Sequence, residues 1–245
     1  MRRINLILAT FGLVIIASCA HKSGHDRRGQ FPRKSRTTRV TEKEASTNLI
    51  TKRTSNSTVL DGSEVFKRYN SAIFMVYTTD GSNVYQGSGF FIGENGLAVS
   101  NYHVFKGTGI GAEAIKMPND NTAYKVTDIY QRSEDEDFIL FRVGYDNDSY
   151  IPIASKRPEI GQRVFAIGSP RGLENTFSSG EVSQWRGENL MQISALIDHG
   201  SSGGALINEY GEVVGITSGS FADGSQANLN YAWSIDVVKP YITFE

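Results

Sequence analysis

A serine lies between glycines in Ile197-Asp198-His199-Gly200-Ser201-Ser202-Gly203-Gly204-Ala205-Leu206, just before an apolar run that is typical of a strand. Nucleophilic attack on a carbonyl needs an exposed hydroxyl and backbone N–H groups that point at the developing oxyanion. Glycine permits the tight turn and the close approach of substrate to the main chain. We therefore interpret Ser202 as a nucleophile and the Gly200-Ser201-Ser202 backbone as an oxyanion hole, formed by the N–H groups of Gly200 and Ser202. A plain loop rich in glycine and serine is the alternative that this segment leaves open.

The order of residues along the chain separates two kinds of enzyme. Gly200-x-Ser202-x-Gly204 also fits the nucleophile elbow of the α/β-hydrolases, in which the histidine follows the serine. The four histidines of this chain all precede Ser202: His21, His25, His103 and His199. An elbow enzyme is therefore excluded, whereas the order His, Asp, Ser is used by serine proteases built on two β-barrels.

Composition is that of an ordinary globular protein. The 245 residues suffice for one or two domains, and 39% of them are hydrophobic and 21% charged. The 25 glycines suit a β protein with many turns. The net charge of −1 gives no sign of nucleic-acid binding, so we expect no nucleic-acid partner.

The N-terminus reads as a secretion signal, residues 1–18. Arg2 and Arg3 precede an apolar run over residues 4–16, which is too short to span a bilayer comfortably. The run ends in Ile16-Ala17-Ser18-Cys19, which resembles the lipobox of bacterial lipoproteins, where the cysteine sulfur carries a diacylglycerol. Cys19 is the only cysteine, so an internal disulfide framework is ruled out. An ordinary signal peptide with an incidental cysteine is the alternative.

The lipobox resemblance implies a location as well as a modification. Several acyl chains on one residue give stable anchoring, because each buried methylene contributes roughly 0.8 kcal/mol. We therefore expect membrane association through Cys19 in the bacterial cell envelope, with the rest of the chain facing the periplasm. Ala20 follows the cysteine in place of an aspartate, and by resemblance to known sorting patterns this favours the outer over the inner membrane.

Residues 19–58 are expected to form a disordered basic tether behind the lipidated cysteine. Residues 20–58 hold ten Lys or Arg against three Asp or Glu, a net charge of +7. Such a segment has too few large apolar side chains to order itself, and its charge could lie against anionic head groups. His21 and His25 have a metal-like spacing, but in a disordered tether we expect neither a metal site nor a cofactor.

Residues 59–245 are expected to form an all-β domain after a short helix at 61–69, which Asp61 or Ser63 can cap. Short apolar runs separated by turn residues predict strands rather than a parallel α/β sheet. These runs are 72–78, 88–92, 97–100, 124–130, 138–143, 164–167, 180–185, 191–193, 205–207, 213–217 and 231–235. The length suffices for two small barrels, over about 71–150 and 151–235.

Two residues of the first barrel are candidates for activating Ser202. His103 ends an apolar strand and enters a loop, as suits a general base that must reach into a cleft. Asp137 lies at the junction between an acidic cluster and a buried strand, where it can become desolvated and hold the imidazole in one tautomer. Asp135 is the second choice for this carboxylate.

Four blocks in the right order make the chain similar to the protease domain of the HtrA/Deg family of trypsin-like serine proteases, over residues 61–240. The blocks are Gly87-Ser88-Gly89-Phe90 with Ser100-Asn101-Tyr102-His103-Val104, Asp137-Phe138-Ile139-Leu140, Ala166-Ile167-Gly168-Ser169-Pro170-Arg171-Gly172-Leu173 leading into Ser179-Gly180-Glu181-Val182-Ser183, and 200–206 followed by 211–216. The resemblance implies two six-stranded antiparallel β-barrels with short N- and C-terminal helices. It also implies an active site between the barrels, with His103 and Asp137 from the first and Ser202 from the second.

The resemblance also guides expectations about specificity. Trypsin-like proteases set the primary pocket partly by the residue six before the nucleophile, which here is the uncharged Leu196. Thr217, Ser218 and Gly219 would form the pocket wall and pair with an extended substrate. We therefore expect Val, Ile, Ala or Leu at the P1 position of the substrate.

Two departures from the family pattern limit what can be carried over. Ser201 replaces the usual asparagine before the nucleophile, but still offers a backbone N–H. The chain ends at Glu245, which leaves no room for the peptide-binding PDZ domain that is common in the family, so neither its regulation nor trimer formation is carried over. The oligomeric state is left open.

Two functions follow from these patterns. The first is an endopeptidase that cleaves proteins or peptides of the cell envelope through His103, Asp137 and Ser202. The second is a membrane-anchored binding or chaperone-like module that keeps the fold with an inactive or conditionally formed site. The complete triad favours the endopeptidase.

Overall fold

The computed structural model describes residues 49–51, 58–109, 111–169, 175–220 and 229–244, all within one compact unit. The signal peptide, Cys19 and most of the tether, including His21 and His25, lie outside the described residues. In the described part of the chain, every helix is too short or too polar to cross a bilayer.

The domain opens with the expected helix, α1 (Gly62–Tyr69). The Asp61 side chain accepts a hydrogen bond from the Glu64 N–H, and the Glu64 carboxylate accepts one from the Asp61 N–H. This reciprocal capping box satisfies two N–H groups that the first turn leaves unpaired. Val65 and Tyr69 are buried, and a 3₁₀ turn, η1 (Asn70–Ala72), leads into the first strand.

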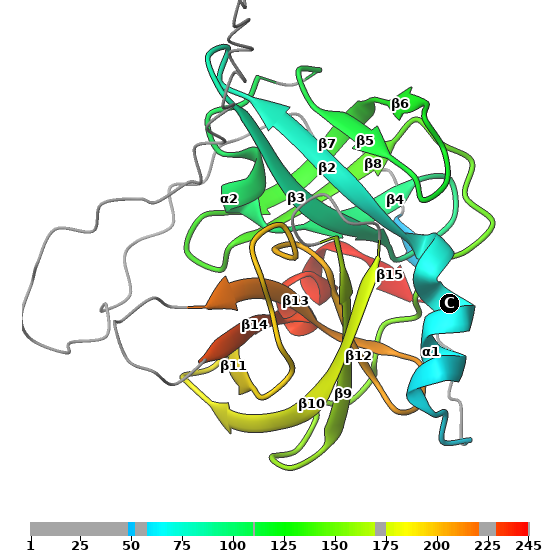
Figure 1. Cartoon of the computed structure of the whole chain (residues 1–245), viewed down its shortest axis with the longest axis vertical. Helices are drawn as coiled ribbons and strands as arrows, with labels where there is room; N and C mark the ends of the chain where they lie inside the picture. Colours follow the sequence, from blue (N-terminus) through cyan, green and yellow to red (C-terminus); the bar gives the residue numbers. More distant parts are fainter. Residues whose placement is uncertain (1–48, 52–57, 110, 170–174, 221–228, 245) are drawn as a thin grey trace, which may run out of the picture. The chain divides into compact units, whose positions relative to one another are not determined.

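Seven antiparallel strands form the first sheet (Figure 1, cyan to green). They are β2 (Ile73–Thr79), β3 (Val84–Phe91), β4 (Leu97–Ser100), β5 (Ala114–Lys116), β6 (Ala123–Tyr124), β7 (Val126–Ser133) and β8 (Phe138–Val143), in the spatial order β6-β5-β2-β3-β4-β8-β7. No ladder joins the described edge strands β6 and β7, so this sheet is an open half-barrel of seven strands, consistent with the two-barrel fold that we expect. Only Lys125 separates these two strands in sequence, so the sheet's edges meet at this residue.

The second sheet is the closed six-stranded barrel that the sequence predicts. Its strands are β9 (Arg163–Gly168), β10 (Thr176–Trp185), β11 (Leu190–Ile193), β12 (Ala205–Asn208), β13 (Val213–Ser220) and β14 (Asn230–Ser234). Their spatial order is β10-β11-β14-β13-β12-β9, with every pair antiparallel. The all-β class is therefore confirmed. The sequence patterns missed β5, which is only three residues long.

The two described ends of the domain pair with each other. β1 (Ile50–Thr51) runs parallel to β15 (Thr243–Phe244), after the 3₁₀ turns η3 (Ile235–Val237) and η4 (Lys239–Tyr241). The Thr51 hydroxyl donates a 2.6 Å hydrogen bond to the Ile92 carbonyl and is buried. Residues 49–51, which the sequence assigns to the tether, are thus part of the folded unit.

Three apolar clusters hold the unit together. One lies within the first sheet and one within the second barrel. The third is shared, because it contains Ile73, Phe90 and Val99 of the first sheet together with Phe165 and Ile167 of the barrel. Each fully buried large side chain contributes about 1.5–3 kcal/mol, so this shared cluster fixes one sheet against the other. Loops from both sheets are thereby held at fixed distances.

Candidate active site

His103 and Asp137 are in direct contact. Nδ1 of the imidazole lies 2.8 Å from Oδ2 of Asp137, and the backbone N–H of His103 donates a 2.9 Å hydrogen bond to Oδ1. The carboxylate therefore binds the ring and the main chain of the same residue. This arrangement fixes the imidazole so that Nε2 is the nitrogen left for chemistry.

A short helix rather than a loop carries His103. α2 (Tyr102–Phe105) buries Val104 and Phe105 in the core of the first sheet. Because adjacent helical residues point in different directions, the His103 side chain remains outside the core and is 46% exposed. The apolar pair after His103 is the sequence signal for this placement.

Asp137 adopts an unusual backbone conformation for a residue other than glycine. Its φ is +45°, in the left-handed region that Asp tolerates better than most residues. The Asn101 side chain donates a 2.8 Å hydrogen bond to its carbonyl oxygen and holds this turn just before β8. The Asp137 side chain is only 15% exposed, so its hydrogen bonds are shielded from water.

Ser218, at the end of the barrel strand β13, reaches the same carboxylate. Its hydroxyl donates a 2.9 Å hydrogen bond to Oδ2 of Asp137. The next residue, Gly219, is close to the nucleophile, because a Cβ added there would lie 3.5 Å from Oγ of Ser202. His103 is therefore connected through Asp137 to Ser218, and the next residue, Gly219, lies beside the Ser202 hydroxyl.

The nucleophile loop also contacts the first sheet directly. The Ser88 N–H donates a 2.8 Å hydrogen bond to the carbonyl oxygen of Ser202. Gly87 fits between that carbonyl and Val104, which follows His103 in the chain. A Cβ added at Gly87 would lie 3.2 Å from the Ser202 carbonyl oxygen and 2.6 Å from the Val104 side chain. Within the described residues, no hydrogen bond joins the His103 ring to the Ser202 hydroxyl. Such bonds are commonly long before substrate binds.

Residues 198–201 form a β-turn that orients the predicted oxyanion hole. The Ser201 N–H donates a 3.0 Å hydrogen bond to the Asp198 carbonyl, and Gly200, the third residue of the turn, has φ +93°. A turn with a positive φ only at its third residue is of type II. In a type II turn the central peptide, here His199–Gly200, is rotated by about 180° from its orientation in a type I turn. The glycine therefore determines where its own N–H points.

The Ser201–Ser202 peptide is held from the opposite side. The Thr217 hydroxyl donates a 2.7 Å hydrogen bond to the Ser201 carbonyl. Because a trans peptide directs its C=O and N–H oppositely, this contact points the Ser202 N–H away from Thr217. The N–H groups of Gly200 and Ser202 donate to no described residue, whereas that of Ser201 is used within the turn.

The residues expected to form the specificity pocket separate into three environments. The Leu196 side chain is 66% exposed, so it does not form a buried pocket floor, although its carbonyl is bound by the Ser178 hydroxyl at 2.8 Å. Thr217 is buried and supports the oxyanion turn. Ser218 binds Asp137, and Gly219 adjoins the Ser202 hydroxyl.

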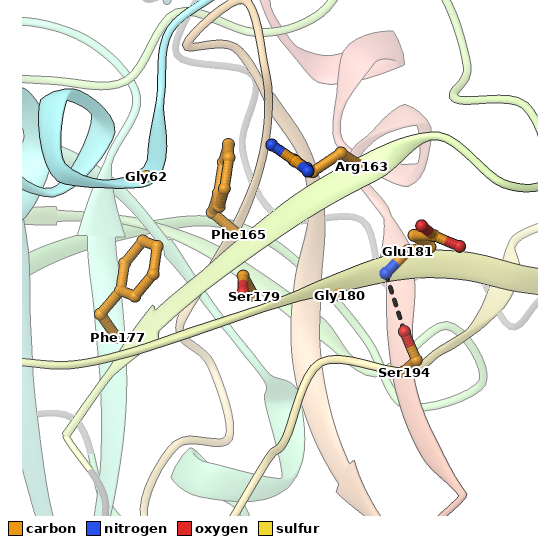
Figure 2. Close-up of a pocket in the computed structure, with 8 residues that line it drawn as sticks. All are labelled: Gly62, Arg163, Phe165, Phe177, Ser179, Gly180, Glu181 and Ser194. Carbon is orange, nitrogen blue, oxygen red and sulfur yellow. Dashed lines mark hydrogen bonds between the residues drawn. The ribbon is translucent and has the colours of Figure 1, made fainter.

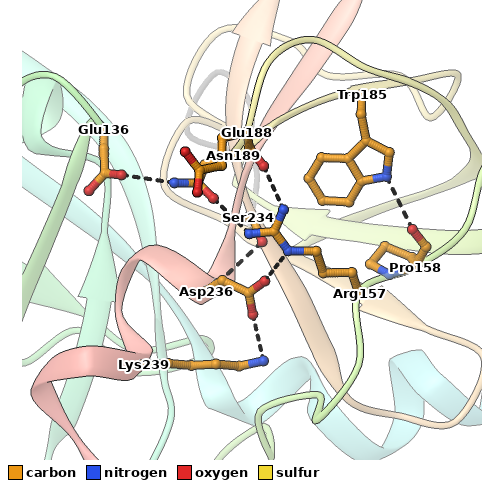
Figure 3. A network of polar contacts seen from close by, with 9 residues as sticks. All are labelled: Glu136, Arg157, Pro158, Trp185, Glu188, Asn189, Ser234, Asp236 and Lys239. Carbon is orange, nitrogen blue, oxygen red and sulfur yellow. Dashed lines mark hydrogen bonds and ion pairs between the residues drawn. The ribbon is translucent and has the colours of Figure 1, made fainter. Parts of the chain in front are cut away.

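A polar network centred on Arg157 connects the barrel to the turn that carries Asp137 (Figure 3). The Asn189 amide donates a 2.9 Å hydrogen bond to Glu136 in the turn between β7 and β8 and accepts one of the same length from Arg157. The guanidinium also pairs with Asp236 and lies 5.2 Å from the centre of the Trp185 ring. Glu136 directly precedes Asp137, so this network supports the candidate carboxylate from the barrel side.

A cavity, here called the outer cavity, lies away from these residues. It has a volume of about 590 Å³ on the barrel strands β9 and β10, near the start of α1, and its lining includes Phe165, Phe177 and Ser194 (Figure 2). None of the three triad candidates lines it. The described residues also hold no group of three or more His, Cys, Asp or Glu side chains placed to bind a metal ion.

Sequence reasoning did not identify the supporting residues of this site. The roles of Asn101, Thr217 and Ser218 depend on contacts with residues distant in sequence, and Ser88 was noticed only as part of a family block. The block Gly87-Ser88-Gly89-Phe90 was the available signal, because glycines inside a strand often mark a place where another backbone approaches closely. Asp135, the second choice of carboxylate, is exposed and is not the residue bound to His103.

Comparison with known proteins places this site in a family context. A model of the trypsin-like peptidase domain matches residues 87–216. Serine protease HTRA1A of Danio rerio is 30% identical over 181 residues, which cover 69% of this chain and 36% of that protein. The probable periplasmic serine endoprotease DegP-like of Halomonas elongata is 34% identical over 160 residues, covering 62% of this chain and 33% of that protein. The chain thus spans about a third of the length of these relatives.

A solved structure agrees with the sequence comparisons. The crystal structure of the serine endoprotease from Yersinia pestis matches with a TM-score of 0.66 at 26% identity, over 75% of this chain and 66% of that one. The matched domain model covers more than half of the 245 residues and includes the segments that bear His103, Asp137 and Ser202. The chain therefore belongs to the trypsin-like peptidase domain family, with HtrA and DegP proteases among its relatives.

Proposed function

We propose that this protein is a serine endopeptidase in which His103, Asp137 and Ser202 form the catalytic triad. The observation that carries the proposal is the double contact between His103 and Asp137, with Ser218 joining that pair to the strand beside Ser202. A carboxylate bound to Nδ1 holds the imidazole in the tautomer whose Nε2 can accept a proton from a serine.

The reaction is acyl transfer in two steps. Oγ of Ser202 attacks the peptide carbonyl while His103 takes the hydroxyl proton. His103 then gives that proton to the leaving amine. Water, activated by the same imidazole, hydrolyses the acyl-enzyme. The oxyanion accepts hydrogen bonds from the N–H groups of Gly200 and Ser202, and each such donor accelerates the reaction about 10²- to 10³-fold.

Substrate selection is proposed to favour small or medium apolar side chains at P1. No acidic residue lies six positions before the nucleophile, where Leu196 stands, so a P1 lysine or arginine would lack a charged partner. An extended substrate would pair with the backbone at the end of β13, beside Gly219. Peptides with Val, Ile, Ala or Leu at P1 should therefore be cleaved faster than matched peptides with Lys or Arg.

The proposed location is the bacterial cell envelope, with proteins of that compartment as substrates. Relatives described as probable periplasmic endoproteases support the location, and the Ile16-Ala17-Ser18-Cys19 motif supports a lipid anchor on Cys19 facing the periplasm. We further propose outer rather than inner membrane, since Ala20 follows the cysteine. Mass spectrometry of the mature protein would test the lipid anchor, because a diacylated N-terminal cysteine adds a defined mass that Cys19→Ala lacks.

A second candidate function is a membrane-anchored binding or chaperone-like module. The observation that favours it is the absence, among the described residues, of a hydrogen bond between His103 and Ser202. A site that requires an activating ligand before these two residues engage would bind peptides without cutting them.

Casein digestion by the full-length chain in detergent distinguishes the two functions. Wild type is compared with Ser202→Ala and with Ser194→Ala, an exposed barrel serine on the outer cavity, and a fluorophosphonate probe gives a second readout. The endopeptidase predicts cleavage and labelling in wild type and Ser194→Ala, both lost in Ser202→Ala. Absence of both signals from folded wild type would contradict the endopeptidase and favour the binding module.

A further inference from the structure

We propose that Ser88, on β3 of the first sheet, is a positioning residue that holds the oxyanion hole in shape. The proposal rests on the endopeptidase function described above and adds a residue outside the triad. Among the described residues, Ser88 makes no hydrogen bond to a triad side chain. It acts through the backbone of the nucleophile loop, which belongs to the other sheet.

Four hydrogen bonds meet at Ser88. Its hydroxyl donates to the Gly200 carbonyl at 2.7 Å and accepts from the Ser169 N–H at 2.9 Å. Its own N–H donates to the Ser202 carbonyl at 2.8 Å, and its carbonyl accepts from the Ser100 hydroxyl at 2.7 Å. A serine hydroxyl has a single hydrogen, and because Ser169 donates to the oxygen, that hydrogen is available for Gly200.

The contact with Gly200 acts on the middle one of three consecutive peptide groups. The outer two, 199–200 and 201–202, supply the two N–H groups of the oxyanion hole. The middle peptide is held at both ends, because its Ser201 N–H donates to Asp198 and its Gly200 carbonyl accepts from Ser88. Rotation of this plane would change the backbone angles on both sides and move both donors. Ser88 is the only side chain among the described residues that binds this plane.

Burial makes the contact difficult to replace. Ser88, Ser100 and Ser169 are all fully buried. Loss of the hydroxyl would leave the Ser169 N–H and the Gly200 carbonyl without this partner, and a buried unpaired group costs about 1–3 kcal/mol. The loop can recover part of that cost by turning the Gly200 carbonyl toward water, which is the rotation that dismantles the oxyanion hole.

The contact also explains why the hole depends on both sheets. Residue 88 and residue 200 are 112 positions apart, and one lies on β3 of the first sheet while the other lies in the loop between the barrel strands β11 and β12. The segment after β9 joins through Ser169, whose carbonyl is bound by the Gln86 side chain at 2.6 Å. Any shift of the first sheet against the barrel is therefore transmitted to the oxyanion donors through Ser88.

Steady-state kinetics of Ser88→Ala in the full-length chain test the proposal. The substrate is a fluorogenic peptide with valine at P1, and the fluorophosphonate labelling rate is measured in parallel, because its phosphoryl oxygen occupies the same hole. We expect kcat and the labelling rate to fall about 10- to 100-fold while KM changes less than about twofold, since small misplacement of oxyanion donors affects the transition state rather than substrate binding.

Thr51→Ala is the matched control. Its hydroxyl is also buried and also donates to a main-chain carbonyl, that of Ile92, which lies about 13 Å along the strand from Ser88. Ser88→Cys, which keeps the shape but weakens the hydrogen bond, serves if Ser88→Ala does not fold. It should show the same loss of kcat at constant KM.

Three outcomes decide the question. A large loss of kcat in Ser88→Ala but not in Thr51→Ala, with cooperative thermal unfolding retained, supports the proposal. Wild-type kcat in a Ser88 variant, or equal losses in Ser88→Ala and Thr51→Ala, overturns it. Lack of cleavage and labelling in the wild type is a different result, because it refutes the endopeptidase itself.

Discussion

The Ser218 hydroxyl donates a hydrogen bond to Oδ2 of Asp137, the same oxygen that lies 2.8 Å from Nδ1 of His103. One carboxylate oxygen thus joins a side chain from the barrel to the imidazole of the first sheet. Because Asp137 is largely shielded from solvent, water cannot readily replace the hydroxyl. The orientation of the candidate triad therefore depends on a residue outside it.

Ser218→Ala is expected to lower kcat/KM about 5- to 30-fold without unfolding the protein. The magnitude follows from the loss of one hydrogen bond to a charged group, about 1–2 kcal/mol. Peptide hydrolysis measures the effect, and Ser194→Ala is the control because that serine lies on the outer cavity. Full activity in Ser218→Ala would show that the contact is dispensable.

Gly200→Ala is expected to lower kcat about 10²- to 10³-fold. Alanine is strained at φ +93°, so the turn should change to type I and turn the Gly200 N–H away from the oxyanion. Gly161→Ala is the matched control, because that residue has φ +86° and no atom within 4 Å of an added Cβ. The proposed oxyanion hole would be contradicted by equal kcat in the two variants.

Asn189→Asp is expected to weaken the connection between the barrel and the Asp137 turn. The substitution keeps the oxygen that accepts from Arg157 but removes the donor to Glu136 and places two carboxylates in contact. We expect a loss of about 1–2 kcal/mol in the free energy of unfolding and about a tenfold lower kcat, because Asp137 follows Glu136 directly. Chemical denaturation and peptide hydrolysis measure the two effects.

Glu188→Gln is the control for that experiment, since only the Glu188 carbonyl takes part in the network, accepting a 2.6 Å hydrogen bond from Arg157. It should match the wild type in both measurements. If Asn189→Asp loses stability but keeps kcat, the network supports the fold without positioning Asp137.

Asp236→Asn is expected to reduce stability at neutral pH but not in acid. Burial raises the pKa of Asp236, but hydrogen bonds and charge from Lys239 and Arg157 outweigh it and leave the pKa below its ordinary value. A carboxyl with a lowered folded pKa stabilises the fold above its unfolded pKa, near 3.9, and this stabilisation is lost as pH falls through the folded pKa.

The difference in Tm between wild type and Asp236→Asn should therefore shrink as the pH falls from about 5 through the lowered folded pKa of Asp236. Thermal unfolding across that range measures it, with Asp148→Asn as the control at an exposed carboxylate. A difference that stays constant with pH would mean that the charge of Asp236 contributes nothing.

The strand pattern was largely readable from the sequence, because apolar runs and turn residues are local signals. Leu97–Ser100 and Phe138–Val143 match the expected bounds. β5 was missed because three residues give no periodicity, and His103 was expected in a loop because α2 is a single turn. The two-barrel fold was predicted, but the sequence did not show that the first sheet stays open between β6 and β7, because the pairing of edge strands depends on their approach in space.

The sequence by itself determined the nucleophile loop, the chain order of histidine, aspartate and serine, and the family to which they point. Tertiary structure alone decided which side chains support them. Ser218 meets Asp137 across 81 residues, and Ser88 meets Gly200 across 112. Neither separation leaves a trace in local composition or periodicity. The physical reason is that these contacts form only when the shared apolar cluster packs one sheet against the other and excludes water from the polar groups between them.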